Sequence, residues 1–299
     1  MPEMTLSTGA ATDTGRLREL NEDRYWVDAD RGIFLVVDGV GGEAAGDLAA
    51  QTAVESIQQA IAEALPPEAR VRHAIVTANN RIFKLAQEHP EWEGMACVLT
   101  LALVQDGWIT IGHVGDSRFY MIRSGSIRKL TSDHSPAGEC EDRGELSEEE
   151  AMLHPRRHEV FREVGGRLRE AHEKEFIEIR RCPFRPDAAI LLCSDGLTDQ
   201  VTSGEIARIT GRYTGDCEQI ARELVNAANR AGGKDNVTAL FVAGPEFRGS
   251  EGSPVHATRP RFAATRGPTR RRLPAGRGQF VIYGLLLGML LWAVLRTRG

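Results

Sequence analysis

Aspartates beside glycine recur at the ends of apolar runs in this sequence. They occur at Asp38-Gly39, Gly115-Asp116 and Asp195-Gly196, and before the last apolar run at Asp235. A single Asp-Gly pair is typical of a turn. Four acids at the ends of buried strands can instead gather at one sheet edge, where like charges raise one another's pKa and a divalent cation relieves the repulsion. Oxygen ligands favour Mg²⁺ or Mn²⁺ over zinc, and glycine lets a backbone carbonyl approach the ion.

A charged segment near the N-terminus adds to this set. Residues 13–23 read DTGRLRELNED, so that Glu22 and Asp23 supply two further acids and Arg18 supplies a nearby guanidinium. Arginine is suited to bidentate capture of a phosphate group. The segment is compatible with a phosphate ligand beside the acids, although a solvated turn has the same composition.

Apolar runs bounded by turn residues predict the strands that must position these acids. The runs cover residues 33–37, 97–104, 108–114, 118–123, 188–193 and 237–242. Asp106-Gly107, between two of the runs, is typical of a hairpin. Helical periodicity predicts helices over 46–65, 68–88 and 216–231. Because turns join most of the strands, we expect an α+β domain with mainly antiparallel sheets.

Charge is distributed unevenly along the 299 residues. Residues 1–243 contain 27 Lys and Arg against 40 Asp and Glu, whereas residues 244–279 contain eight Arg and two Glu. An acidic body does not suit nonspecific binding of nucleic acid, so we expect no nucleic-acid partner. The five cysteines form no C-x-x-C pair, which argues against a zinc site or a disulfide framework and fits a reducing compartment.

The C-terminal region divides into a basic linker, an apolar helix and a short tail. Residues 244–279 are rich in Pro, Gly, Arg and Thr, as flexible linkers are. Residues 280–295, FVIYGLLLGMLLWAVL, carry no charge. At 1.5 Å per residue they span roughly 24 Å, short of a hydrocarbon core of about 30 Å. Arg277 and Arg296 can extend to the interfaces, so we expect a transmembrane helix, with a buried helix as the alternative.

The expected topology follows from the arginines around this apolar segment. Seven Arg lie between Arg259 and Arg277, whereas only Arg296 and Arg298 follow, in the tail 296–299. Positive charge accumulates on the cytoplasmic side of membrane proteins. We therefore expect a single-pass protein of the inner cell membrane, with the domain 1–243 in the cytoplasm.

Taken in order, the charged segments and strands resemble the metal-dependent protein phosphatases of the PPM (type 2C) family, bacterial type. The matching segments, spread over about residues 8–243, are DTGRLRELNED (13–23), FLVVDGVGGEAAGDLAA (34–50), VGDSRFYMIRSG (114–125), LTSDHS (130–135), HPRR (154–157), LLCSDGLTDQV (191–201) and AGGKDNVTALFV (231–242). The resemblance implies two stacked β-sheets flanked by helices. It also implies hydrolysis of phosphoserine and phosphothreonine in proteins, in opposition to a Ser/Thr kinase.

The resemblance further implies a centre of two or three Mn²⁺ or Mg²⁺ ions. In such a centre Asp38 bridges two ions and the carbonyl of Gly39 binds one of them. Asp195 and Asp235 hold the other ion. Water activated between the two cations then attacks the phosphorus in line.

Four further elements of the site follow from the same resemblance. Glu22 and Asp23 would act mainly through water molecules on the metals. Asp116 would bind a third, weaker ion. Arg18 would grip the substrate phosphate, which makes it a catalytic residue together with the aspartates. Residues 136–163 would form a flap that affects access of the substrate.

One departure from the family bears on catalysis. Val40 stands where some members carry a general-acid histidine. His113 is a possible substitute, although a histidine in a strand is more often structural. A membrane-tethered pseudophosphatase, or an assembly module with the same fold, is the alternative function, and the presence of Asp38, Asp195 and Asp235 argues against it.

Overall fold

Two β-sheets form the centre of the fold in the computed structural model. The structure describes residues 4–40, 45–250 and 256–257. One sheet has the strand order β1-β10-β9-β6-β7-β11. Its strands are β1 (Ser7–Asp13), β6 (Arg118–Arg123), β7 (Ser126–Lys129), β9 (Ala188–Cys193), β10 (Val237–Ala243) and β11 (His256–Ala257). Its neighbouring strands are antiparallel, except that β11 runs parallel to β7.

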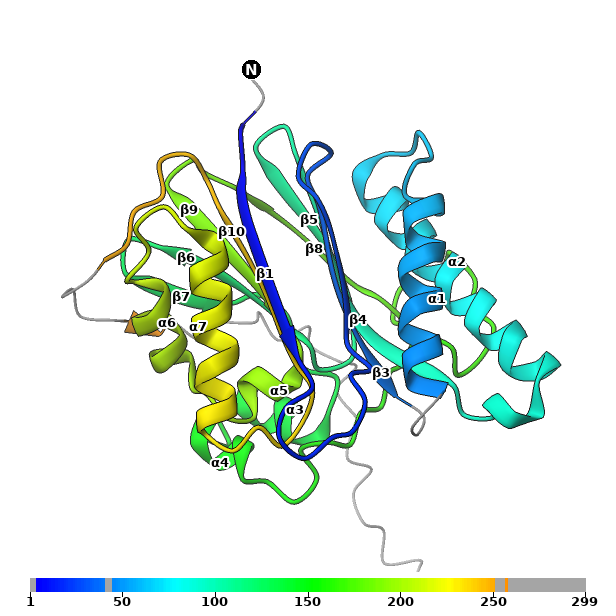
Figure 1. The fold of residues 1–299 in the computed structure, drawn as a ribbon. Coiled ribbons are helices and arrows are strands. Elements are labelled where there is room, and N and C mark those ends of the chain that lie inside the picture. Colours follow the sequence, from blue (N-terminus) through cyan, green and yellow to red (C-terminus); the bar gives the residue numbers. More distant parts are fainter. Residues whose placement is uncertain (1–3, 41–44, 251–255, 258–299) are drawn as a thin grey trace, which may run out of the picture. The chain divides into compact units, whose positions relative to one another are not determined.

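The second sheet is antiparallel throughout and has the order β2-β3-β4-β5-β8. Its strands are β2 (Arg24–Asp28), β3 (Ile33–Val40), β4 (Ala96–Gln105), β5 (Trp108–Val114) and β8 (Glu178–Pro183). The two sheets pack face to face (Figure 1). The predicted α+β fold with two mainly antiparallel sheets is therefore confirmed.

Helices cover the outer face of each sheet, as Figure 1 shows. α1 (Ala45–Ala60) and α2 (Pro67–Glu88) pack on the sheet that contains β3. α6 (Ser203–Thr210) and α7 (Cys217–Arg230) pack on the sheet that contains β10. Shorter helices lie in the connections: η1 (Pro90–Trp92), α3 (Pro136–Asp142), α4 (Glu148–Met152) and α5 (Asp195–Thr198).

Alternation of side chains along the strands creates a core on each side of each sheet. In β3, Ile33, Leu35 and Val37 face α1 and α2, whereas Phe34 and Val36 face the other sheet. All five side chains are fully buried. Because both faces of the strand are covered, it is a continuous apolar run rather than an alternating one.

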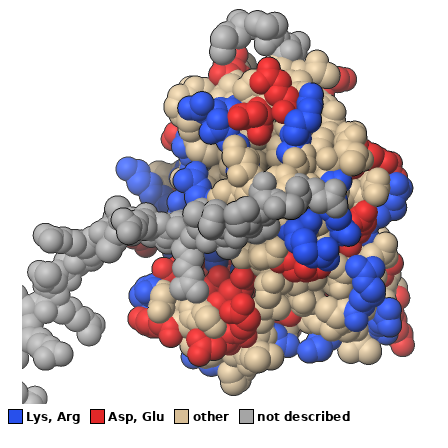
Figure 2. Space-filling view, turned by 90° about the vertical axis from the view of Figure 1, so that its left-hand side faces the viewer, with Lys and Arg blue, Asp and Glu red and all other residues tan. Residues whose placement is uncertain are grey.

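The described surface carries both signs of charge. On the face shown in Figure 2, acidic and basic side chains are interspersed. Exposed ion pairs of the described residues include Arg143 with Glu139 and Arg208 with Glu205.

The C-terminal predictions fall largely outside the described residues. Among the residues that the structure describes, no helix is both long enough and apolar enough to cross a membrane. The predicted transmembrane helix 280–295 and the tail 296–299 lie beyond the described part. Phe247, in the segment expected to be a linker, is 3 % exposed and contacts the rings of Tyr213 and Phe241. Packed structure thus continues past residue 243.

Candidate active site

Strand ends bring four aspartates to one cleft. Asp38 lies near the end of β3, Asp116 follows β5, Asp195 begins α5 directly after β9, and Asp235 stands just before β10. All four line a single cleft of about 890 Å³. The cleft lies at the edge of the sheets where α5 is found in Figure 1. Carboxylates that are far apart in the sequence thus share one site.

Two glycines beside these aspartates allow other segments of backbone to approach closely. A Cβ atom at Gly196 would lie 1.9 Å from the carbonyl oxygen of Asn236. A Cβ atom at Gly39 would lie 2.3 Å from the carbonyl oxygen of Gly46. Neither distance is compatible with a side chain, so packing requires the glycine of each Asp-Gly pair.

Glu22 and Asp23, which precede β2, complete the group of acids. Asp23 is 2 % exposed and accepts a hydrogen bond of 2.7 Å from Ser194 Oγ. Glu22 lines the cleft. Among the described residues, Glu22 Oε1 and Asp23 Oδ1 are buried carboxylate oxygens without a hydrogen-bond partner. A buried acceptor without a partner is costly, and a cation would satisfy it.

Three carboxyl groups of the site, those of Asp38, Asp116 and Asp23, hold their protons unusually tightly. Burial, followed by the charges of Asp23 and Asp195, raises the pKa of Asp38 well above its usual range. Burial, followed by Asp195, does the same to the pKa of Asp116. Burial also raises the pKa of Asp23 to about 7. An all-oxygen set of mutually repelling carboxylates fits hard divalent cations such as Mn²⁺ and Mg²⁺.

Arg18 stands at the rim of this acidic group. Its Nη2 donates a hydrogen bond of 2.8 Å to Asp235 Oδ2, and its side chain is 52 % exposed. This hydrogen bond raises the pKa of Arg18, so the guanidinium stays charged. Since a guanidinium has five N–H donors, the bond to Asp235 leaves donors for an anion in the cleft.

Asn236 fixes the loop that carries Arg18. Its Nδ2 donates to the carbonyl oxygens of Thr14 and Leu20, at 2.9 and 2.8 Å. Its Oδ1 accepts a hydrogen bond of 2.8 Å from the backbone N–H of Glu22. One amide side chain thus holds both ends of the loop against β10.

The family-level comparison agrees with this geometry. Residues 18–240, which include all the acids of the cleft and Arg18, match the model of the family described as protein phosphatase 2C. The chain belongs to the protein phosphatase 2C family. The family predicted from the sequence is confirmed.

Individual relatives support the assignment of this chain to the protein phosphatase 2C family. The chain is 35 % identical over 240 residues to the serine/threonine phosphatase stp of Listeria welshimeri, which covers 77 % of this chain and 93 % of the relative. A crystal structure of the Mycobacterium tuberculosis serine/threonine phosphatase PstP/Ppp matches with a TM-score of 0.72 and 29 % identity, over 80 % of this chain and 98 % of that one. A structure of the PstP catalytic domain in complex with two manganese ions matches with a TM-score of 0.70 and 29 % identity, over 81 % and 99 % of the two chains.

Three cleft residues of the phosphatase were not singled out from the sequence. Asp199 lies one helical turn after Asp195, and burial followed by the charge of Asp195 raises its pKa to about 6. Arg157 Nε lies 3.2 Å from Asp199 Oδ2, and His158 Nδ1 lies 3.4 Å from the same oxygen. The spacing of Asp195 and Asp199 is a signal that would have found Asp199. The loop that carries Arg157 and His158 has no periodic pattern to place it.

His113 does not reach the cleft. It is fully buried in β5, where Nδ1 hydrogen-bonds to Thr100 Oγ1 at 2.9 Å and Nε2 donates to the carbonyl of Ser132 at 3.1 Å. Burial lowers its pKa, so the ring is neutral. His113 is structural and is not a substitute for the acid that Val40 replaces.

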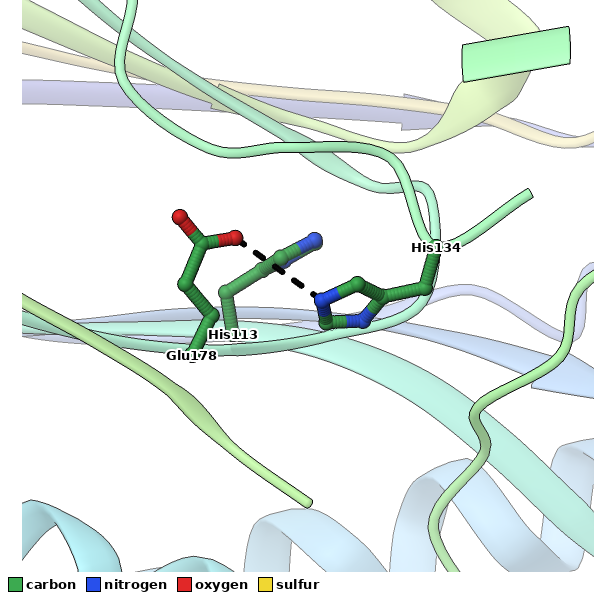
Figure 3. A group of neighbouring side chains, drawn as sticks. All are labelled: His113, His134 and Glu178. Carbon is green, nitrogen blue, oxygen red and sulfur yellow. Dashed lines mark ion pairs between the residues drawn. The ribbon is translucent and has the colours of Figure 1, made fainter. Parts of the chain in front are cut away.

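Figure 3 shows His113 beside His134 and Glu178. Their ligand atoms lie within 4.8 Å of one another, which is close enough for a metal ion. The nitrogens of His134 have other neighbours, however: Nδ1 accepts a hydrogen bond of 3.0 Å from the N–H of Gly115, and Arg162 Nη1 lies 3.0 Å from Nε2. A guanidinium next to Nε2 opposes a metal cation there.

His134 instead connects two parts of the site. One side of the ring binds Gly115, the residue before Asp116. The other side contacts Phe161 and Arg162 of the predicted flap, and the His134 carbonyl accepts a hydrogen bond from the N–H of Phe161 at 2.9 Å. Burial lowers the pKa of His134 to about 2, so it remains neutral. The flap is thereby linked to the loop that carries Asp116.

Proposed function

We propose that Asp38, Asp195 and Asp235 form the metal centre of a Ser/Thr phosphoprotein phosphatase and that Arg18 binds the phosphate of its substrate. The observation that carries this proposal is the convergence of carboxylates from four separate segments on one cleft, beside a half-exposed guanidinium. Membership of the protein phosphatase 2C family and the similarity to stp and PstP make the chain a metal-dependent Ser/Thr protein phosphatase.

The metals are Mn²⁺ or Mg²⁺, the hard ions that oxygen ligands favour, and the similar PstP structure contains two manganese ions. Asp38 would serve both ions. The carbonyl of Gly39 would hold one of them, and Asp195 and Asp235 would hold the other. Ions of this class supply Lewis acidity and lower the pKa of water. The unpartnered oxygens of Glu22 and Asp23 fit a role as acceptors for water molecules on the metals.

The remaining groups of the chain would orient the substrate. Arg18 would donate to the phosphate oxygens, while Asp235 keeps the guanidinium turned toward the cleft. A fixed positive charge at this position stabilises the charge that develops on those oxygens. Asn236 supports this role because it holds the loop of Arg18 in place.

Hydrolysis of p-nitrophenyl phosphate tests the proposal. We expect hydrolysis that requires Mn²⁺, stops on addition of EDTA and is lost in Asp38→Asn. Asp106→Asn is the matched control, because Asp106 belongs to an Asp-Gly turn that does not line the cleft. Equal activity of Asp38→Asn and the wild type would refute the proposed centre, and an inactive wild type would favour the pseudophosphatase alternative.

The proposal extends to the surroundings of the enzyme. A phosphoprotein substrate must be made before it is hydrolysed, so a Ser/Thr kinase is the opposing enzyme. Residues 280–295 form an uncharged segment behind a basic one, and we assign them to a single transmembrane helix. The phosphatase domain, which includes packed residues beyond 243 such as Phe247, would then lie on the cytoplasmic side of the inner membrane. The rest of the basic segment 244–279 would connect it to the helix.

A further inference from the structure

Two leucines near Arg18 expose their side chains to solvent at the cleft. Leu17 is 71 % exposed and Leu20 is 53 % exposed. Both line the cleft together with Arg18. Exposed apolar side chains scattered singly over a surface are ordinary. A pair on either side of the guanidinium in one loop is a more specific arrangement, because a polypeptide whose phosphate is bound by Arg18 lies next to both side chains.

Hydrogen bonds of the backbone hold this loop, residues 14–20, in place. The N–H of Arg16 donates to the carbonyl of Gly233 at 2.6 Å. The carbonyl of Leu20 accepts a hydrogen bond of 2.8 Å from Asn236 Nδ2. The exposed position of the leucines is therefore a fixed feature of the loop. An apolar surface that is fixed before binding loses little conformational entropy when a ligand covers it.

Apolar side chains also line the cleft from two other segments. Val40, at the end of β3, and Val160, in the predicted flap, are both partly buried and face the same space. The cleft has a volume of about 890 Å³, and pockets of about 300–1,000 Å³ bury whole drug-sized ligands. The cleft thus has room and apolar surface for the residues that adjoin a phosphorylated one.

Charged side chains at the rim do not replace this apolar contact. Glu19 lies between the two leucines in the sequence, and Lys234 lines the same cleft, so that both signs of charge occur there. Exposed ion pairs contribute little in water. Removal of an exposed leucine side chain from water contributes more, and this contribution does not compete with the phosphate for Arg18.

We propose that Leu17 and Leu20 are specificity-determining residues, which bind apolar side chains next to the phosphoserine or phosphothreonine of a protein substrate. The enzyme thereby selects phosphorylation sites that have apolar neighbours. The inference rests on the proposed function, because it takes Arg18 as the group that binds the phosphate.

Mn²⁺-dependent phosphate release from two phosphothreonine peptides tests the inference. One peptide has leucine on both sides of the phosphothreonine, and the other has serine in both places. We expect the wild type to hydrolyse the leucine peptide with a kcat/KM at least about tenfold higher, since burial of side chains of this size supplies such a factor. Leu17→Ser and Leu20→Ser should each reduce the preference at least about threefold, mainly by raising KM for the leucine peptide.

The matched control is Leu168→Ser, because Leu168 is 51 % exposed and does not line the cleft. We expect this variant to keep the preference of the wild type. A wild type without a preference would overturn the inference, and that result is expected if a second copy of the chain covers the leucines instead. An equal fall for both peptides in the two cleft variants would also overturn it, since the leucines would then only position Arg18.

These outcomes distinguish the inference from the proposed function. A missing preference, or an equal fall for both peptides, would leave the proposed function intact, because the wild type would still release phosphate in the presence of Mn²⁺. A wild type that hydrolyses neither peptide would refute the proposed function and the inference together.

Discussion

Ionisation of Asp23 is unfavourable in the folded protein, chiefly because its carboxyl group is buried. It is 2 % exposed, and burial raises its pKa to about 7, against about 3.9 in an unfolded chain. Between about pH 4 and pH 7 the folded protein therefore binds a proton that the unfolded chain has released. By linkage, the contribution of Asp23 to stability falls as the pH rises through this window.

Asp23→Asn should make the metal-free protein more stable than the wild type. The difference in the free energy of unfolding grows from pH 4 to pH 7, by at most roughly 4 kcal/mol, because Asn cannot ionise. Urea denaturation in EDTA at pH 4.5 and pH 8 measures it. With Mn²⁺ present the advantage of the variant shrinks, since the ion binds only the folded state. The same difference at both pH values in EDTA would contradict this reading of Asp23.

Arg118 is the buried cation behind the site. It is 7 % exposed and contacts Asp133 at 2.6 Å and Glu141 at 2.8 Å. The guanidinium and Lys129 hold the pKa of Asp133 below its usual range despite burial. These contacts attach α3, the first helix of the flap, to β6.

Arg118→Leu should destabilise the fold by about 3–5 kcal/mol, because it removes the hydrogen-bonding guanidinium from two buried carboxylates and leaves only the more distant Lys129 beside them. Chemical denaturation at pH 7 measures the loss. Arg123→Leu is the matched control, since Arg123 and Asp187 are both about two-fifths exposed. We expect little change in the control. Equal losses in the two variants would show that burial of the Arg118 pair has no special importance.

Close backbone packing at the strand ends is what gathers the site. The Cα of Gly196 faces the carbonyl of Asn236 so closely that no side chain fits between them. Asp195 directly precedes Gly196 in the sequence, and Asp235 directly precedes Asn236. The distance between Asp195 and Asp235 thus depends on the contact between the start of α5 and the residue before β10 as well as on the two acids themselves.

Gly196→Ala should separate these two segments. We expect a loss of stability of about 1–3 kcal/mol from overpacking and a larger fractional loss of Mn²⁺-dependent activity. Gly204→Ala, an exposed position in α6 whose nearest neighbour is 3.9 Å from the added Cβ, is the control. It should stabilise the helix by about 0.5–1 kcal/mol and leave activity unchanged. A fully active Gly196→Ala would contradict the packing argument.

Elements with an apolar signal were predictable, and others were not. The six apolar runs all form strands, and the three periodic segments form α1, α2 and α7. β1 was missed because α7 packs so closely on it that a Cβ at Gly9 would lie 2.2 Å from the backbone N of Glu218. Such contact demands small residues, which carry no hydrophobic pattern. β2 and β8 were missed because edge strands with charged residues resemble loops.

The same distinction applies to the site. The strands could be predicted from their apolar runs. The four aspartates at the strand ends could therefore be located as well: Asp38, Asp116, Asp195 and Asp235. Their convergence on one cleft depended on strand order, which the family resemblance supplied. His158 carried no signal, since its place beside Asp195 is set by the path of an irregular connection.

At the scale of the whole molecule, the sequence divides the chain into an acidic catalytic part and a basic, then apolar, C-terminal part. Removal of residues 280–299 tests the proposed membrane helix. We expect the 299-residue chain to stay with membranes after carbonate extraction and the shortened one to be released. Its Mn²⁺-dependent hydrolysis should be unchanged, because the described residues that line the cleft all lie between Leu17 and Asn236. Release of the 299-residue chain by carbonate would refute the anchor.

Release of phosphate from a phosphothreonine peptide, measured as Mn²⁺ is titrated into the metal-free protein, tests the central claim most directly. The account predicts activity that rises with the binding of at least two Mn²⁺ per chain. It also predicts that Asp38→Asn, Asp195→Asn and Asp235→Asn each bind less Mn²⁺ and release no phosphate. Asp106→Asn should bind Mn²⁺ and release phosphate as the wild type does. Phosphate release that persists in EDTA, or in all three variants, would contradict it.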